Sequence, residues 1–182
     1  YVLPLVIAGG GLLGCVIGLL YAQIKKMGDD PSKELNLATY ISAGVSIVTC
    51  GVAAFIAFGN ADVNVLTALG FKLGWASPWI CAVLGIVSGV AIGAITEYYT
   101  SDKFSPTKQI AEYATEGEAF LVTKGDAVGS RSCLYPILVI AVSLLISGAI
   151  CGTYGIAIAS LGMLSFVGTT VSIDAFGPIA DN

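Results

Sequence analysis

Residues 1–24 read YVLPLVIAGGGLLGCVIGLLYAQI, and this run without a single charged side chain decides the class of fold. A helix needs about 20 residues to cross a bilayer. In hydrocarbon the backbone N–H and C=O groups must pair within the segment, which favours helix. Four further apolar stretches have comparable length, at 37–59, 73–99, 133–153 and 154–176. The sequence therefore predicts an all-α fold, a polytopic transmembrane helix bundle with five spans in residues 1–182.

The composition supports a membrane protein. Hydrophobic residues make up 56% of the chain and charged residues 11%, compared with about 25% charged in an average soluble domain. A chain so poor in charge could not cover its surface as a soluble monomer, which excludes a nucleic-acid binder, a disulfide-rich secreted domain and a disordered tail. The chain begins inside an apolar run and ends inside a polar motif, so we expect an internal fragment of a longer protein.

Small residues recur at four-residue spacing in three of these stretches. Such spacing lets helix backbones approach closely in lipid, where there is no hydrophobic drive for association. We therefore expect a tightly packed bundle. The spacings in question are Gly10/Gly14/Gly18, Gly85/Gly89/Gly93 and Gly148/Gly152.

The basic residues predict the orientation of the spans. Seven of the eight lie in two segments, 25–36 and 100–132, and the eighth, Lys72, lies between the second and third spans. Because cytoplasmic loops carry an excess of Lys and Arg, both segments are expected to be cytoplasmic loops. The fifth span then ends on the same side, so residues 174–182 are expected in the cytoplasm. The seven residues are Lys25, Lys26, Lys33, Lys103, Lys108, Lys124 and Arg131.

The cysteines and histidines give little support for a metal or thiol site. None of the five cysteines has a partner at metal-ligand spacing, and the sequence contains no histidine. Buried thiols that pack as small apolar groups explain the cysteines. Any acid–base or metal chemistry in this chain is therefore expected to fall to carboxylates.

Two carboxylates follow the last apolar run in the segment IDAFGPIADN, residues 173–182. If the helix continues through this segment, Asp174 and Asp181 share a face, because seven residues are close to two turns. Pro178 would free the carbonyl of Asp174 and kink such a helix. Carboxylate oxygens together with the amide of Asn182 suit a hard cation such as Mg²⁺. The alternative is an ordinary polar helix end with solvated acids, and the spacing alone does not decide between the two.

Three runs lie near the end of the chain: YGIAIA at 154–159, GMLS at 162–165 and DAFGPIADN at 174–182. Together they resemble the membrane-integral pyrophosphatases, the ion pumps that hydrolyse pyrophosphate and move H⁺ or Na⁺. The run ITEYYTS at 95–101 is similar to the same family's segment at the inner end of an earlier helix. The resemblance covers residues 59–182, whereas residues 1–58 fit by hydropathy only.

The resemblance implies a homodimer of about sixteen helices per chain in two concentric rings, in which the five spans are helices seven to eleven. It also implies Mg²⁺-dependent hydrolysis of pyrophosphate coupled to transport of H⁺, Na⁺ or both, with K⁺ as a further candidate cofactor. Asp174 is the first candidate Mg²⁺ ligand and Asp181 the second, and both, with Asn182, are candidate contacts to the substrate. Most of the family's catalytic aspartates and lysines lie on helices before and after this piece. No catalytic residue is therefore assigned here, and the fragment alone is not expected to be active.

Two other functions remain open from the sequence. A secondary transporter also uses small-residue helices and a proline-containing polar break, although near the middle of the bilayer. A non-catalytic packing subunit would leave the pair Asp174 and Asp181 without a purpose. The expected partners are the lipid bilayer, pyrophosphate, the transported ion and a second copy of the chain, with no nucleic acid. A cell inner membrane is expected by default, with a vacuolar or other internal membrane as the alternative.

Overall fold

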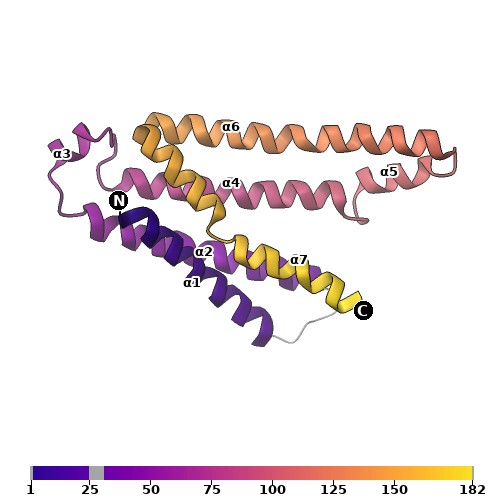
Figure 1. Cartoon of the computed structure of the whole chain (residues 1–182), viewed down its shortest axis with the longest axis horizontal. Helices are drawn as coiled ribbons and strands as arrows, with labels where there is room; N and C mark the ends of the chain where they lie inside the picture. The colour runs from indigo at the N-terminus through magenta and orange to yellow at the C-terminus, as the bar shows by residue number, and fades with distance from the viewer. Residues whose placement is uncertain (1, 25–30, 182) are drawn as a thin grey trace. The chain divides into compact units, whose positions relative to one another are not determined.

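A computed structural model describes the backbone of residues 2–24 and 31–181 and the side chains of 2–24 and 34–175. This part of the chain forms seven helices and no strand (Figure 1), which confirms the predicted all-α fold. The helices are α1 (Val2–Ile24), α2 (Pro31–Phe58), α3 (Val63–Ala68), α4 (Ala76–Thr100), α5 (Ser105–Tyr113), α6 (Glu118–Leu164) and α7 (Val167–Asp181).

Four helical stretches in the described residues are long and apolar enough to cross a membrane. They are Val2–Ile24, Glu34–Phe58, Ala76–Tyr113 and Glu118–Ala175. Large apolar side chains along them remain exposed, for example Leu5, Ile56 and Leu145 at 74–77%. Such exposure fits helices whose outer faces contact lipid or further helices, and it agrees with the predicted transmembrane bundle.

The long helix α6 contains a reversal of the chain. Cys151 (φ −139°, ψ 18°) and Gly152 (φ 58°, ψ −151°) leave the helical conformation, and α6 turns back on itself there (Figure 1). The backbone N–H of Lys72 donates a hydrogen bond of 3.2 Å to the carbonyl of Ile150, which satisfies one of the acceptors freed at the end of the first arm. The fourth apolar stretch thus contains two arms, and the reversal lies beside the boundary at 153/154 that separates the last two predicted spans.

Two details of the helices differ from the sequence prediction. Segment 100–132, interpreted as a loop, is largely helical, because α5 occupies part of it and α6 begins at Glu118. Residues 154–176 were expected to form one continuous helix, but this helix is interrupted at Ser165 and Phe166, between α6 and α7. The first difference arises because residues such as Glu, Ala and Lys favour helix outside the membrane as well as in it.

The chain divides into two compact units, and α4 and α6 each contribute to both. The first unit comprises Tyr1–Val87 and Ser143–Asn182, and the second comprises Ser88–Val142. The second unit contains the end of α4, α5 and the beginning of α6. The first contains the remaining helices, and in it α7 packs against both α1 and α2.

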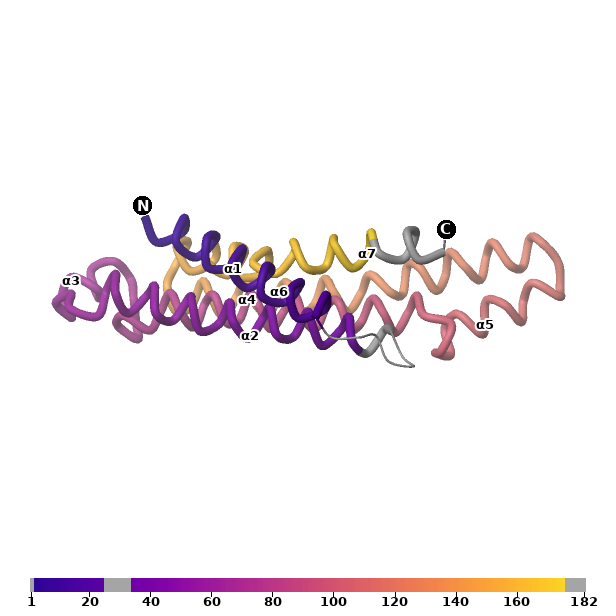
Figure 2. The backbone as a smooth tube through the Cα atoms, turned by 90° about the horizontal axis from the view of Figure 1, so that it is seen from below, coloured from indigo at the N-terminus to yellow at the C-terminus, as the bar shows by residue number. Residues whose placement is uncertain are grey.

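In the first unit, α1 and α2 lie side by side along most of their lengths (Figures 1 and 2). The stripe Gly10/Gly14/Gly18 makes this approach possible. A Cβ at Gly14 would lie 2.8 Å from the carbonyl oxygen of Ser42, and one at Gly18 would lie 2.7 Å from that of Ala38. This close packing confirms the prediction for the first glycine run. In the second run, Gly85 meets a neighbouring helix, whereas Gly93 has open space around it among the described residues.

Candidate functional site

The candidate site begins at the interruption between α6 and α7, because this break leads into the helix that carries Asp174. The backbone N–H and the hydroxyl of Ser165 both donate hydrogen bonds to the carbonyl of Gly162, at 3.1 and 2.7 Å. The thiol of Cys15 on α1 donates to the carbonyl of Ser165 at 3.3 Å. The polar groups released by the break are therefore partly satisfied by a local turn and by a neighbouring helix, as a buried break requires.

Small residues of α1 make room for the break. A Cβ at Gly11 would lie only 2.7 Å from the carbonyl oxygen of Ser165, so no larger residue fits at this position without displacing the turn. Phe166 completes the turn, and its side chain is buried. The break is thus a packed feature of the first unit.

The first turn of α7 is attached to α2 by a hydroxyl pair. Thr169 is fully buried, and its hydroxyl donates a hydrogen bond of 3.1 Å to the hydroxyl of Ser42, which is also fully buried. One turn further along α2, the hydroxyl of Ser46 is buried and has no hydrogen-bond partner among the described residues. The contacts of Ser165 and Thr169 hold the start of α7 against α1 and α2.

The backbone of α7 continues from Val167 through Pro178 to Asp181. The continuous helix that the spacing argument requires between Asp174 and Asp181 is therefore present. The side chain of Asp174 is exposed. The side chain of Asp181 and the whole of Asn182 lie outside the described residues, so their placement beside Asp174 stays a prediction. Within residues 2–24 and 34–175, no three acidic or cysteine side chains come together as a metal site would require.

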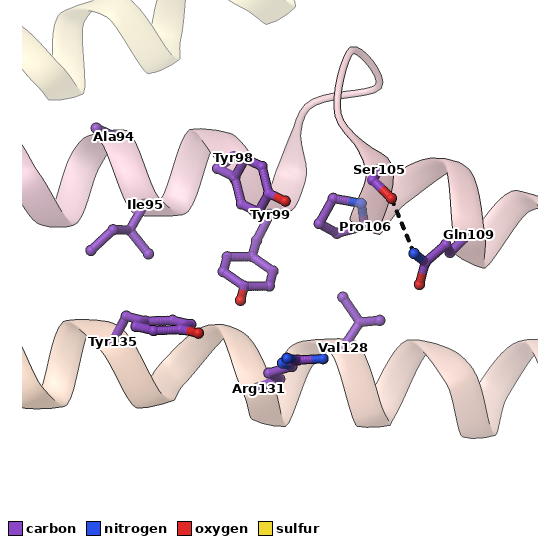
Figure 3. A pocket seen from close by; sticks show the side chains of 10 residues that line it. All are labelled: Ala94, Ile95, Tyr98, Tyr99, Ser105, Pro106, Gln109, Val128, Arg131 and Tyr135. Carbon is purple, nitrogen blue, oxygen red and sulfur yellow. Dashed lines mark hydrogen bonds between the residues drawn. The ribbon is translucent and has the colours of Figure 1, made fainter.

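A second candidate site lies within the second unit. A pocket of about 550 Å³ is bounded by the end of α4, by α5 and by the first arm of α6 (Figure 3). Tyr98 and Tyr99 of α4 line it on one side, and Arg131 and Tyr135 of α6 line it on the other. The rings of Tyr99 and Tyr135 stack with their centroids 6.3 Å apart, and the amide of Gln109 donates to the hydroxyl of Ser105 at 3.0 Å.

This pocket was not predicted from the sequence. Arg131 was interpreted there only as one of the basic residues that indicate the orientation of the spans. One signal was available: Arg131 and Tyr135 are four residues apart in a sequence that forms helix, so their side chains share a face. The partner face on α4 could not be known without the packing of the two helices.

Comparison with known proteins shows a close relationship to one family. All of residues 1–182 match the sequence profile of the family described as inorganic H⁺ pyrophosphatase. The chain is 42% identical over 171 residues to the K⁺-stimulated pyrophosphate-energized sodium pump of Thermotoga maritima, a match that covers 93% of this chain and 23% of the relative. It is 31% identical over 192 residues to the K⁺-insensitive pyrophosphate-energized proton pump of Chloroflexus aurantiacus, covering 100% of this chain and 24% of the relative.

A third relative is also a pyrophosphate-energized pump. The chain is 33% identical over 187 residues to the K⁺-insensitive pyrophosphate-energized proton pump of Methanosarcina mazei, a match covering 98% of this chain and 26% of the relative. The chain thus spans about a quarter of the length of these relatives. All three relatives are named as pumps driven by pyrophosphate, and none of them is named as a secondary transporter or a packing subunit.

Proposed function

Because the chain belongs to the inorganic H⁺ pyrophosphatase family, we propose that the intact protein couples hydrolysis of pyrophosphate to transport of Na⁺ or H⁺ across a membrane. The observation that carries this proposal is the family match over every residue of the chain. The relatives named above include both sodium and proton pumps, so either ion is a candidate cargo. K⁺ is a candidate activator, since one of these relatives is named as stimulated by it.

The oxygen donors of the last segment fit the chemistry of Mg²⁺. This ion prefers carboxylates, waters and substrate phosphates at short distances, and it is often held by only one or two protein carboxylates. Asp174 would supply one exposed carboxylate, and we propose Asp181 and Asn182 as further contacts to the metal and the substrate. Because the described residues contain no group of three ligands, the rest of the coordination would come from water, pyrophosphate and other parts of the intact protein. When bound, Mg²⁺ would neutralise phosphate oxygens and polarise the bridging bond.

The contribution of this chain is to position those oxygen donors. The break at Ser165 and the attachment of Thr169 to Ser42 hold the start of α7 against α1 and α2, and Asp174 follows Thr169 by about one and a half turns. Such positioning matters because catalysis of phosphoryl transfer depends mainly on orientation and charge stabilisation. Moving one elementary charge across the membrane costs about 2.3 kcal/mol per 100 mV. The apolar parts of the five spans contain no charged residue, so the ionisable gate would lie elsewhere in the intact protein.

The wider assembly follows from the family as part of the same proposal. The intact protein would contain about sixteen helices in two rings and would work as a homodimer. The five spans would correspond to helices seven to eleven, with segments 25–36, 100–132 and 174–182 on the cytoplasmic side. A cell inner membrane is the proposed location, supported by the relatives from Thermotoga maritima and Methanosarcina mazei.

The substitution Asp174→Asn in the intact protein tests the role of this carboxylate. Reconstituted vesicles would be supplied with pyrophosphate and Mg²⁺, with and without K⁺, and both phosphate release and ion uptake would be measured. We expect both rates to fall by about 10²-fold or more, the loss typical of removing a preorganised charge-stabilising group. Asp62→Asn is the matched control, because Asp62 is an exposed acid before α3 on the predicted outer side, and its loss should leave both rates unchanged.

The two possible failures are distinguishable. Near-normal hydrolysis by the Asp174→Asn protein would refute the role of Asp174 while leaving the pump intact. A folded wild-type protein that releases no phosphate from pyrophosphate, or that transports ions without it, would refute the proposed function itself.

A further inference from the structure

We propose that the pocket of the second unit binds the headgroup of an anionic phospholipid, with Arg131 as the cationic contact to the phosphate. The pocket lies within Ser88–Val142, and all of its lining residues come from the end of α4, from α5 and from the first arm of α6. None of its lining residues belongs to α7, the helix that carries Asp174. The proposal rests on the polarity of the pocket, its charge and its size.

The lining of the pocket is apolar at one end and mixed at the other. At one end lie Ala94 and Ile95, in the part of α4 that continues its apolar stretch, and Tyr135 lies opposite them on α6 (Figure 3). At the other end lie Ser105, Pro106 and Gln109 of α5, with Val128 of α6 opposite them. A phospholipid also has an apolar end and a mixed end, because its acyl chains meet its phosphate at the glycerol.

Tyrosines mark the level of the membrane at which the pocket lies. Tyr98 and Tyr99 line the pocket between its two ends and Tyr135 lines its apolar end, and Tyr98 also packs against Phe104 with ring centroids 5.1 Å apart. Tyrosine is enriched at the boundary between hydrocarbon and headgroups, since its ring is apolar and its hydroxyl is polar. The short helix α5 begins directly afterwards, at Ser105, and contains both apolar and charged residues. The pocket is therefore placed where lipid headgroups would be.

The charge of the lining favours an anion. Arg131 is the one charged residue among the lining residues, and no described residue forms an ion pair with it. The acids of this unit, including Glu97, Glu112 and Asp126, do not line the pocket. A guanidinium group binds phosphate with two parallel hydrogen bonds, which suits a lipid phosphodiester. Lys124, two turns earlier on α6, lies instead over the ring of Tyr113 at 4.9 Å from its centroid.

The size of the pocket separates a lipid from a free anion. A volume of about 550 Å³ falls within the range of about 300–1,000 Å³ that is typical of sites for ligands of moderate size. Phosphate or pyrophosphate would occupy only the part of the pocket near Arg131, and the anion would not fill the apolar end beside Ile95. A lipid headgroup with the first part of its acyl chains would fill both ends.

Lipid binding to the intact protein in detergent tests this proposal. The protein would be titrated with phosphatidylglycerol or with phosphatidylcholine, and the bound lipids would be counted by native mass spectrometry. For Arg131→Gln, we expect the affinity for the first phosphatidylglycerol to fall about fivefold, the loss expected for one basic residue beside an anionic lipid. The affinity for phosphatidylcholine should not change. Lys124→Gln removes a charge from the same helix outside the pocket, and it should change the affinity for phosphatidylglycerol by less than about twofold.

A second variant tests the pocket without changing its charge. Ile95→Trp would fill the apolar end and should also weaken phosphatidylglycerol binding, although Arg131 is retained. If both variants bind phosphatidylglycerol as tightly as the wild type does, the proposal is wrong. Equal losses for Lys124→Gln and Arg131→Gln would indicate a diffuse charge effect and would also overturn it. Displacement of the lipid by millimolar pyrophosphate or inorganic phosphate would assign the pocket to a soluble anion, again against the proposal.

Discussion

Where α4 crosses the second arm of α6, two glycines each face the main chain of the other helix. A Cβ at Gly85 would fall on the carbonyl of Ala159, and a Cβ at Gly162 would fall on the carbonyl of Ala82. Both obstacles are backbone atoms, so no rotation of a side chain can relieve them. The substitution Gly85→Ala should therefore force the two helices apart and destabilise the first unit.

The expected magnitude follows from two opposing effects. Inserting a methyl group into a well-packed contact typically costs about 1–3 kcal/mol. Alanine also favours helix over glycine by up to about 1 kcal/mol, which offsets part of that cost. Gly93→Ala provides the matched control on the same helix, because a Cβ at Gly93 meets no atom within 4 Å among the described residues. The propensity gain is common to both variants, so the free energy of unfolding should be about 1–3 kcal/mol lower for Gly85→Ala than for Gly93→Ala.

Unfolding of the intact protein in mixed detergent, followed by circular dichroism, would measure this difference. Double substitutions test the stated cause. Ala159→Gly should not rescue Gly85→Ala, because the carbonyl of residue 159 remains. Thr49→Ala should partly rescue Gly10→Ala, because the obstacle there is the side chain of Thr49, whose hydroxyl oxygen would lie 2.7 Å from the new Cβ. Equal stability of Gly85→Ala and Gly93→Ala, or a rescue by Ala159→Gly, would refute the reasoning.

Two further predictions concern the reversal in α6 and the orientation of the chain. Gly152→Ala should lower the free energy of unfolding of the intact protein by about 1–3 kcal/mol through backbone strain alone, because φ is 58° there and a Cβ would meet no atom within 4 Å. Gly148→Ala lies in a regular helix beside the flexible side chain of Ile156, so it should cost less in the same unfolding assay. In a Cys133→Ser background, a membrane-impermeant maleimide should label Asn64→Cys in intact cells and Lys103→Cys only after permeabilisation; the reverse pattern would contradict the orientation inferred from the basic residues.

The sequence predicted the features that depend on local pattern. The length of uncharged runs such as residues 1–24 indicates helix by itself, and the spacing of Gly10, Gly14 and Gly18 indicates a close neighbour without identifying it. The interruption at Ser165 could not be predicted in the same way. Neither a proline nor a charge marks it, and the residues that stabilise it, Gly11 and Cys15, are about 150 positions away in the sequence. A break held by distant partners leaves no local signal.

The two candidate sites also differ in how far the local sequence predicts them. Asp174 is apparent from the sequence because an acid directly after an uncharged run is rare and costly unless it has a function. The pocket around Arg131 was missed because it exists only when the end of α4 lies opposite the first arm of α6. Tyr98, Tyr99 and Tyr135 each look like ordinary interfacial anchors until that arrangement is known.

The break between α6 and α7 changes which residues control the position of Asp174. In an uninterrupted helix, Asp174 would be placed by the arm of α6 that precedes it. Here α7 is attached through Thr169 to Ser42 on α2, and the turn before it rests on Gly11 of α1. Both attachments lie in residues 1–58, where the resemblance by motif did not reach, although the family profile matches these residues as well. The small and hydroxyl-bearing residues of α1 and α2 therefore support the proposed metal site together with the motif, because they hold the start of the helix that carries its carboxylate.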